Sequence, residues 1–334
     1  MSRFEELRQI LRDREYFKIV CGAGNEDADE VRKLSLVYTL AGALGIDVSA
    51  NVDVVKNSVL GVNKAFELAP KLGKKLKTRP FINVSIGMRG DPHIRKAKID
   101  ADICSSCGSC LEYCLQKAIT NDFQVIEKRC IGCGECGRVC PANAVSFFDK
   151  RNELKKILPD CLANGTETFE LHAIIPDEES VMADWKLVNK FLADNYISMC
   201  LDRSQLSDTE VIRRIKAAYE ITGERMIVQA DGVPMSGGKD DYNTTLQTIA
   251  ISDIVRKSNV PVMILASGGT NSKTGNLAKL CGVDINGVSI GTFARKLVAD
   301  YINKDNFEND LDLIGKAVTV AEKLVKENLE DIRG

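Results

Sequence analysis

Eight of the twelve cysteines in this chain of 334 residues fall between Cys104 and Cys140. They form two sets, each with two, two and three residues between successive cysteines, and the second set repeats the first after 26 positions. Thiolates at this spacing bind iron–sulfur clusters in bacterial ferredoxins, where three cysteines on a tight loop bind one cluster and the fourth reaches a second cluster. The sets are Cys104, Cys107, Cys110 and Cys114, then Cys130, Cys133, Cys136 and Cys140.

The ligands are therefore expected to cross between the two halves of the repeat. One 4Fe-4S cluster would be bound by Cys104, Cys107, Cys110 and Cys140, and the other by Cys130, Cys133, Cys136 and Cys114. Pro141 follows Cys140, as in the ferredoxin run, whereas Leu115 follows Cys114; we interpret this difference as a weaker turn with intact ligands. The sequence thus predicts two 4Fe-4S clusters as cofactors.

Zinc and disulfides are the other chemistries that clustered cysteines serve. Zinc favours tetrahedral sites built from separate ligand pairs, often with histidine, but His93 and His172 both lie outside the run. Disulfides need an oxidising compartment, and the charged start MSRFEELRQ is unlike a secretory signal. The spacing therefore favours iron–sulfur clusters in a cytoplasmic protein.

Charge and hydropathy narrow the expected partners. The formal net charge is −2 with acidic and basic residues mixed, so no field of one sign would attract nucleic acid. The longest strongly apolar stretch, residues 35–48, is too short to cross a bilayer. We expect no nucleic acid and no membrane, but a redox partner protein or a small-molecule substrate.

The segments around the cysteine run alternate between short apolar stretches rich in valine and isoleucine and longer amphipathic stretches of helical period. Eight βα units indicate an α/β fold of the (β/α)8 TIM-barrel type, with an open Rossmann-like sheet as the alternative. Strands are predicted over residues 17–21, 45–50, 81–86, 169–175, 196–201, 226–230, 262–267 and 287–291. Helices are predicted over, for example, 27–44, 179–195, 207–222, 242–258 and 273–281.

The cysteine run follows the third predicted strand, where a barrel has a βα loop. We therefore divide the chain into a first part of the barrel over 1–96, a ferredoxin-like insert over 97–149 and the remainder of the barrel over 150–334. Active sites of such barrels lie on this face. Clusters in the insert could then pass electrons to a ligand bound there.

Glycines at the ends of the last two predicted strands suggest a phosphate site. Backbone amides and a helix start could bind the phosphate at Gly268, Gly269, Gly291 and Thr292. These segments resemble the ends of flavin-dependent barrels such as the dihydroorotate dehydrogenase and nitronate monooxygenase groups, which implies FMN as a candidate cofactor. Barrels without flavin bind phosphorylated substrates in the same way, and glycines also simply end strands.

Asp231 is a further candidate for ligand binding, because it ends the sixth strand and begins the glycine-rich loop 232–238. A plain surface turn is the alternative, since glycine and proline build turns. Gly22 and Gly24 lack the third glycine of a dinucleotide fingerprint, so NAD is not expected. No general acid or base is assigned, and His172 is interpreted as a core residue with satisfied hydrogen bonds.

The remaining cysteines and several polar residues near strand ends are expected to have structural roles for the most part. Cys161, Cys200 and Cys281 are interpreted as small buried apolar residues, although Cys21 and Cys200, near strand ends, could be reactive thiols. Polar residues after the second and third strands could line the mouth, but such residues more often face solvent or cap helices. They are Asn51, Asp53, Lys56, Asn83, Ser85 and Arg89.

Three segments, together with the cysteine run, resemble the light-dependent period (LdpA-like) iron–sulfur protein family. The segments are KIVCGAGNEDADEV from Lys18, QADGVPMSGG from Gln229 and ILASGGTN from Ile264. The resemblance spans most of the chain. In cyanobacteria that family is associated with redox input to the circadian clock, which implies a redox-sensing role for its relatives.

Two functions are expected. In the first, the clusters deliver electrons to FMN or a phosphorylated substrate over Gly268, Gly269, Gly291 and Asp231, and the protein is an oxidoreductase. In the second, the oxidation state of the clusters changes a surface that a partner protein reads, and the barrel is a scaffold. Bound flavin would favour the first function, and clusters without flavin the second.

Overall fold

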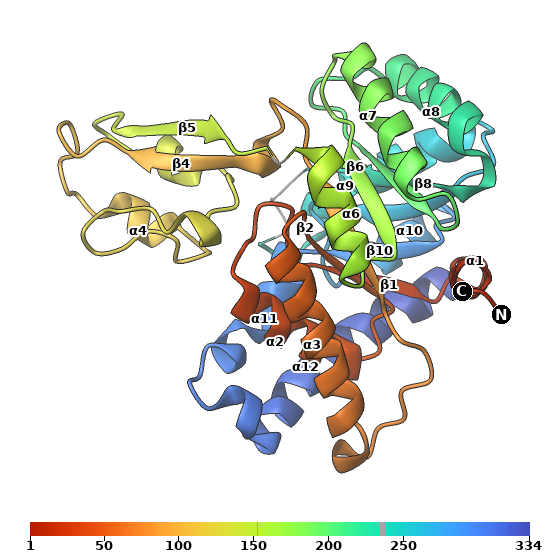
Figure 1. The fold of residues 1–334 in the computed structure, drawn as a ribbon, viewed down its shortest axis with the longest axis horizontal. Coiled ribbons are helices and arrows are strands. Elements are labelled where there is room, and N and C mark those ends of the chain that lie inside the picture. The colour runs from red at the N-terminus through yellow and green to blue at the C-terminus, as the bar shows by residue number, and fades with distance from the viewer. Residues whose placement is uncertain (152, 234–237) are drawn as a thin grey trace.

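The computed structural model describes residues 1–151, 153–233 and 238–334, and a closed barrel of eight parallel strands forms its centre (Figure 1). The order around the barrel is β1, β10, β9, β8, β7, β6, β3, β2. The bounds are Tyr16–Val20 (β1), Gly45–Ser49 (β2), Phe81–Ile86 (β3), Thr168–His172 (β6), Ile197–Leu201 (β7), Met226–Asp231 (β8), Met263–Ser267 (β9) and Gly287–Ile290 (β10). The TIM-barrel prediction is confirmed, and the open-sheet alternative is wrong because β1 pairs with both β10 and β2.

The predicted strands agree with the observed ones to within one residue, except at the end of β6. That strand was expected to reach Ile175 but ends at His172. The carbonyl groups of Ala173 and Ile175 accept hydrogen bonds from the buried guanidinium of Arg214 on a neighbouring helix. The side chain of Arg214 therefore draws the backbone out of the sheet, and this long-range contact has no local signal in the sequence.

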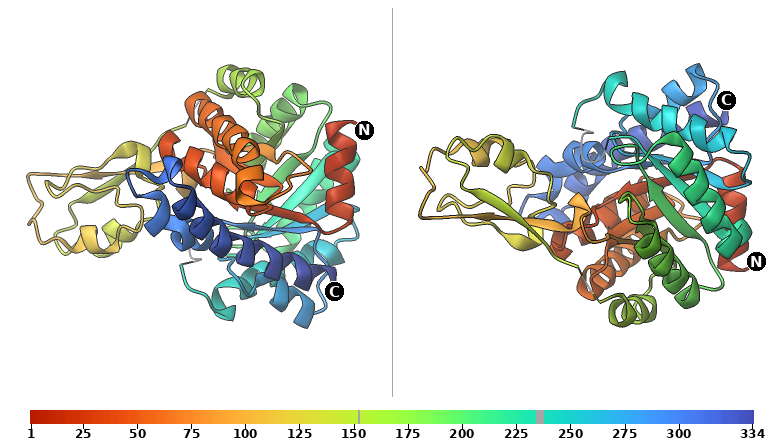
Figure 2. Two further views of the ribbon diagram at one scale, coloured as in Figure 1. Left: turned by 90° about the horizontal axis from the view of Figure 1, so that it is seen from below. Right: turned by 90° about the horizontal axis from the view of Figure 1, so that it is seen from above.

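Helices surround the barrel (Figure 2). The helix predicted over 27–44 ends at Leu40, because Gly42, with φ of +93°, turns the chain toward β2. The bounds are Arg3–Arg12 (α1), Ala28–Leu40 (α2), Val52–Leu68 (α3), Leu154–Ala163 (α6), Glu178–Phe191 (α7), Asp208–Thr222 (α8), Tyr242–Lys257 (α9), Thr274–Leu280 (α10), Thr292–Ile302 (α11) and Leu311–Arg333 (α12).

The barrel has an apolar outer layer and a polar interior. Successive side chains of a strand point to opposite faces, so Phe17 and Ile19 join the main apolar core while Lys18, between them, points into the barrel and is 1% exposed. At the N-terminal end of the strands, Leu7 and Leu11 of α1 close the barrel within a second apolar cluster. The opposite end is left to polar side chains.

Residues 95–149, here called the insert, leave the barrel after β3 and project from it (Figures 1 and 2). Two strands, β4 (Arg95–Ile99) and β5 (Val145–Asp149), pair in antiparallel fashion from Arg95 with Asp149 to Ile99 with Val145. Two short helices lie between them, α4 (Ser109–Tyr113) and α5 (Glu135–Arg138). Both chain termini lie at the end of the molecule away from the insert.

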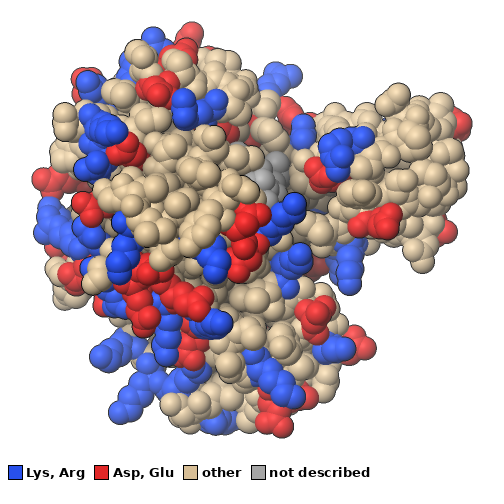
Figure 3. Space-filling view, turned by 180° about the vertical axis from the view of Figure 1, so that it is seen from behind, with Lys and Arg blue, Asp and Glu red and all other residues tan. Residues whose placement is uncertain are grey.

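Within the described residues no helix is both long and apolar enough to cross a membrane. Figure 3 shows acidic and basic side chains interspersed over one face of the barrel, with fewer charged side chains over the insert. The mixed charge of the sequence is therefore also mixed on this surface.

Candidate functional site

The insert gathers its eight cysteines into two groups, and each group lines a cavity. The grouping crosses the sequence repeat, in the arrangement that ferredoxin spacing predicts. The outer cysteine cavity is lined by Cys104, Cys107, Cys110 and Cys140, and the inner cysteine cavity by Cys114, Cys130, Cys133 and Cys136. None of these cysteines forms a disulfide.

Tight turns bring the cysteines of each loop together. Gly108 and Gly134 precede α4 and α5 with φ of +80° and +90°, a conformation that favours glycine. At Gly132 a Cβ atom would lie 2.3 Å from the carbonyl oxygen of Pro92. Only glycine therefore lets this loop rest against the segment that leads from the barrel into the insert.

The two cysteine cavities lie at different depths. The outer cavity is also lined by Ile99 and Val145, at the end of the β4–β5 strand pair that is farther from the barrel, and its Cys107 is exposed. The inner cavity is also lined by Ile131 and by Thr292, the first residue of α11 in the barrel. The inner group is thus next to the barrel and the outer group next to solvent.

A buried cation stands beside the inner cysteines. Lys96 is 2% exposed, and its Nζ donates hydrogen bonds to the carbonyl oxygens of Cys130 at 2.7 Å and Gly24 at 2.6 Å. Burial lowers the pKa of Lys96 and raises the pKa of the Cys136 thiol to about 12. A thiol of this kind gives up its proton when a metal binds it, and Lys96 offsets part of the negative charge that then gathers.

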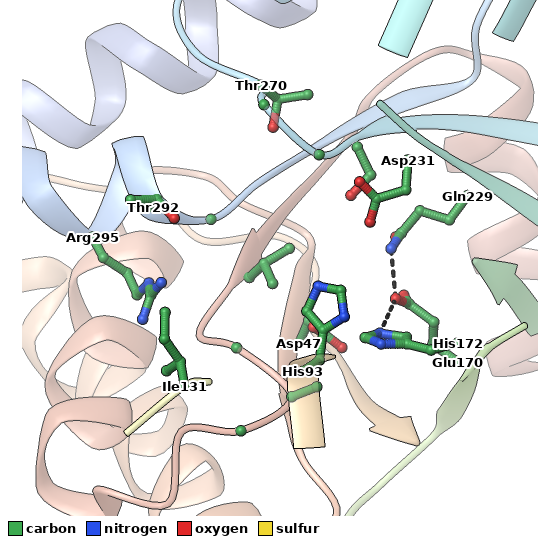
Figure 4. A pocket seen from close by; sticks show the side chains of 18 residues that line it. Asp47, His93, Ile131, Glu170, His172, Gln229, Asp231, Thr270, Thr292 and Arg295 are labelled. Atoms are coloured by element: carbon green, nitrogen blue, oxygen red, sulfur yellow. Dashed lines mark hydrogen bonds and ion pairs between the residues drawn. The ribbon is translucent and has the colours of Figure 1, made fainter. Parts of the chain in front are cut away.

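A third cavity, here called the barrel-mouth cavity, opens at the C-terminal ends of the barrel strands (Figure 4). It has about 80 Å³ of space for the centres of water-sized molecules and opens to solvent at its mouth. His93 and Ile131, from outside the barrel strands, complete its wall. Ile131 and Thr292 line both this cavity and the inner cysteine cavity.

One end of the barrel-mouth cavity is suited to an anion. Gly268 and Gly269 have φ of +67° and +74°, and Gly291 precedes α11, whose first backbone N–H groups have no side-chain cap. Arg295, in the first turn of α11, is 6% exposed, donates to Gln116 Oε1 at 3.0 Å and has a buried Nε without a partner among the described residues. Backbone amides and an unpaired guanidinium bind phosphate or carboxylate.

Asp231 lies where β8 stops, beside Gly268 and away from Arg295 (Figure 4). Its Oδ2 accepts a hydrogen bond from Cys200 Sγ at 3.3 Å, while Oδ1 is buried with no partner among the described residues. Burial raises the pKa of Asp231 to about 6. A Cβ atom on Gly268 would lie 1.5 Å from Oδ1, so the glycine makes room for this carboxyl group.

A hydrogen-bonded chain of charged groups forms the floor of the cavity. Asp91 contacts His93 Nδ1 through Oδ1 at 2.7 Å and His172 Nδ1 through Oδ2 at 2.9 Å. His172 Nε2 lies 3.2 Å from Glu170 Oε1, and Glu170 also pairs with Lys18 inside the barrel. Because carboxylates face both ring nitrogens of His172, its pKa is raised well above the ordinary value despite burial.

The predicted ligand-binding residues share one cavity, whereas the other polar and cysteine candidates lie elsewhere. Gly268, Gly269, Gly291, Thr292 and Asp231 all line the barrel-mouth cavity, whereas residues 234–237 of the glycine-rich loop lie outside the described residues. Of the polar candidates, Asn51 caps α3, and Asn83 and Ser85 donate hydrogen bonds to Asp47 inside the barrel. Cys161 and Cys200 are buried as expected. Cys281 is exposed, so the prediction that it is buried was wrong.

Sequence reasoning missed the cation and the acid–base groups of the cavity. Arg295 could have been found, because it follows the predicted Gly291–Thr292 helix start within one turn. His172 has the satisfied hydrogen bonds that were expected, yet it also lines the cavity. His93 had no local signal, because it reaches the cavity from the segment that joins β3 to the insert.

Two segments of the chain match known protein families. Residues 161–327 match the family described as "Light dependent period A C-terminal domain", and residues 123–146 match "4Fe-4S binding domain". The chain belongs to the light dependent period A family. A member from Synechococcus elongatus, "Light dependent period A", is 27% identical over 95% of this chain and 92% of its own length.

Two further proteins are similar to this family member. A "Ferredoxin" of Pyrobaculum islandicum is 30% identical over 26% of this chain and 80% of its own length. The solved structure of the YdjI aldolase from Escherichia coli K12 aligns with 98% of this chain over 95% of the aldolase chain, with 10% sequence identity and a TM-score of 0.46. Because residues 123–146 match the 4Fe-4S binding domain and a ferredoxin is among the relatives, this light dependent period A family member is an iron–sulfur protein of the electron-transfer type.

Proposed function

We propose that the protein is an oxidoreductase that carries two 4Fe-4S clusters and reduces or oxidises an anionic small molecule in the barrel-mouth cavity. The outer cluster would be held by Cys104, Cys107, Cys110 and Cys140, and the inner by Cys114, Cys130, Cys133 and Cys136. Bound there, the clusters supply single electrons, one each. The residues of the chain would bind the small molecule and limit its contact with water.

The residues fit two clusters for two reasons. Each cavity has four thiols, which is the ligand number of a 4Fe-4S cluster. Ala97, Ala118 and Ile119, together with three of the cysteines, are the buried apolar residues around which the insert packs. An interior this small needs bound metal to hold its shape.

The observation that carries the proposal is the shared wall of two cavities. Ile131 lies between Cys130 and Gly132 in the inner cysteine loop and also lines the barrel-mouth cavity. Thr292 lies on the same two cavities from the side of the barrel. A ligand in the barrel-mouth cavity would therefore be separated from the inner cysteines by a single layer of side chains.

Arg295 and the glycine amides define the class of ligand. A phosphate at this end would receive N–H groups of Gly269 and Thr292 and the charge of Arg295. FMN and a phosphorylated substrate both offer such a phosphate, and FMN would let single electrons drive two-electron chemistry. Ile131 of the insert and His93 of the segment that leads into it cover the cavity and so reduce its contact with water.

The first experiment measures iron, sulfide and flavin on protein purified without oxygen, together with its visible spectrum. About eight irons per chain are expected from two 4Fe-4S clusters. One bound FMN would establish the flavin form of the proposal, whereas eight irons without flavin would leave a phosphorylated substrate as the ligand. Four irons or fewer in fully loaded protein would contradict the two-cluster assignment.

Single cysteine variants test which residues hold each cluster. Cys104→Ala and Cys130→Ala should each remove about half of the iron, because each lies in a different group of four. Cys281→Ala is the matched control, since this exposed cysteine lies outside both cysteine cavities and should lose no iron. Full iron content in either of the first two variants would refute the ligand sets.

A second function is favoured by the surface of the insert. Ile103, next to Cys104 in the sequence, is 53% exposed, and Phe148, which lines a further cavity together with Cys104, is 43% exposed. Exposed apolar residues of this kind often lie at protein contacts. A redox partner could dock there and either donate electrons or read the oxidation state, as a sensor of the light dependent period type would require. Partner binding that follows redox state, in protein without flavin or substrate turnover, would favour the sensor over the oxidoreductase.

A further inference from the structure

Two titratable groups in the barrel-mouth cavity are each oriented by one hydrogen bond and have a second polar atom left over. Asp231 is bonded through Oδ2 to Cys200 Sγ, and its Oδ1 has no partner among the described residues. His93 is bonded through Nδ1 to Asp91, and its Nε2 has no hydrogen-bond partner among the described residues. Both side chains line the cavity.

The position of His93 is fixed by its own segment. Asp91 accepts a hydrogen bond from the His93 backbone N–H at 2.9 Å and contacts the ring at 2.7 Å. Pro92 begins the short 3-10 turn Pro92–Ile94. A ring nitrogen bonded to a carboxylate in this way leaves the opposite nitrogen as the reactive one, as in general acid–base catalysis.

His172 makes His93 the exchangeable histidine of the pair. Both nitrogens of His172 face carboxylates, those of Asp91 and Glu170, so its proton is held in place. The side chain of His93 is 14% exposed, and its ring meets His172 edge-on at 4.6 Å between centroids. Figure 4 shows His93, Asp231 and Gln229 away from the Arg295 end of the cavity.

We propose that His93 and Asp231 are the proton donors of the barrel mouth, and that the ligand is an anionic acceptor of the quinone or flavin type. This inference rests on the proposed oxidoreductase function. The acceptor gains two electrons, one from each reduced cluster, and two protons. One N–H bond of His93 and one O–H bond of Asp231 break, two O–H or N–H bonds form on the acceptor, and both donors are reprotonated from solvent.

The arrangement explains why the cavity has unlike ends. The anionic group of the acceptor would lie at Arg295 and the start of α11, which places its ring toward His93 and Asp231. Asp231 with a pKa of about 6 is partly protonated near neutral pH and can serve as a donor there. The charges that face these donors are Asp91 beside His93, His172 and Glu170 on β6, Asp202 after β7, and Arg295 on α11.

Two electron acceptors separate proton transfer from electron transfer in the holoprotein. Anthraquinone-2-sulfonate is an anionic acceptor that takes up protons, whereas ferricyanide accepts electrons without protons. His93→Gln should slow reduction of the quinone by roughly 100-fold, a typical contribution of a general acid, and leave the ferricyanide rate unchanged. Asp91→Asn, which removes the positioning carboxylate, should give a smaller loss with the same selectivity.

Arg295→Gln distinguishes failure of this inference from failure of the proposed function. A slower quinone reaction in Arg295→Gln but not in His93→Gln would overturn the role of His93 and leave the function standing. Unchanged quinone rates in both variants would overturn both, because both require that an anionic acceptor binds at Arg295 in the cavity before it is reduced. Iron content of each variant is measured in parallel so that cluster loss is not mistaken for either result.

Chemical labelling of the wild-type holoprotein gives a readout that does not depend on turnover. The chain has two histidines, and diethyl pyrocarbonate should modify His93 while sparing His172, whose nitrogens are both engaged. Anthraquinone-2-sulfonate should slow labelling of His93 by about tenfold, as occupancy of most sites requires. Equal labelling of both histidines, or no protection by the quinone, would overturn the inference.

Discussion

The insert and the barrel keep their shapes by different means. In the insert, three of the six buried residues that form its apolar core are cysteines proposed to bind iron–sulfur clusters. The strand pair β4–β5 is its only sheet among the described residues. In the barrel, dozens of apolar side chains between strands and helices surround a charged interior. The insert therefore depends on its cofactor, whereas the barrel can hold buried charges that its apolar layer offsets.

The largest expected effect separates the two regions by removing iron. Chelation of the clusters should unfold the insert and leave the barrel folded, because only the insert lacks a sufficient core of its own. Limited proteolysis of the iron-free protein should cut within residues 95–149, while far-UV circular dichroism keeps most of its helical signal. A protease-resistant insert after complete loss of iron would show that its own side chains suffice.

Buried charge in the barrel should give the next largest effect. Lys18→Met removes one of the two cationic groups that face Glu170 inside the barrel, His172 being the other. Loss of one partner from a buried pair costs about 3–5 kcal/mol of unfolding free energy. Lys33→Met is the matched control, since its partner Asp29 is half exposed and such pairs contribute less than about 1 kcal/mol. Urea denaturation of both variants measures the difference; equal losses would mean that Lys18 is not isolated from water.

The same contrast explains what the sequence could predict. Ferredoxin ligands follow from spacing alone, so the pairing of Cys114 with the later cysteines was predictable before any fold was known. The barrel strands were predictable from apolar stretches, and Gly268 and Gly291 from their places at strand ends. The interior network was not predictable, because Lys18 on β1 meets Glu170 on β6 only when the barrel closes, and Asp91 reaches His172 from outside the barrel strands.

A pH-dependent stability difference should appear at Asp231. Burial raises its pKa from 3.8 to about 6, so the folded state binds this proton more tightly than the unfolded state. Its contribution to stability is present in acid and is lost as pH rises from about 4 to 6, with a total of ~3 kcal/mol. Asp231→Asn should therefore be more stable than wild type by up to that amount above pH 6 and equal to it below pH 4; a difference independent of pH would contradict the raised pKa.

The smallest effect tests the close approach of Gly268 to Asp231. Gly268 and Gly282 both have positive φ, of +67° and +63°, but a Cβ atom on Gly268 would lie 1.5 Å from Asp231 Oδ1, while one on Gly282 would meet nothing within 4 Å. Alanine at either position should cost ~1–2 kcal/mol for the backbone conformation. Gly268→Ala should cost ~1–3 kcal/mol more, because Asp231 must move in a packed site.

The two glycine variants also test whether the mouth is built for a ligand rather than for stability alone. Displacement of Asp231 by Gly268→Ala should weaken anthraquinone-2-sulfonate protection of His93, whereas Gly282→Ala should leave it unchanged. Equal unfolding free energies and equal protection in the two variants would mean that Asp231 moves aside at no cost. The Asp231 side chain would then be a mobile part of the cavity wall. The cavity would still bind an anion at Arg295, but Asp231 would not be a fixed proton donor.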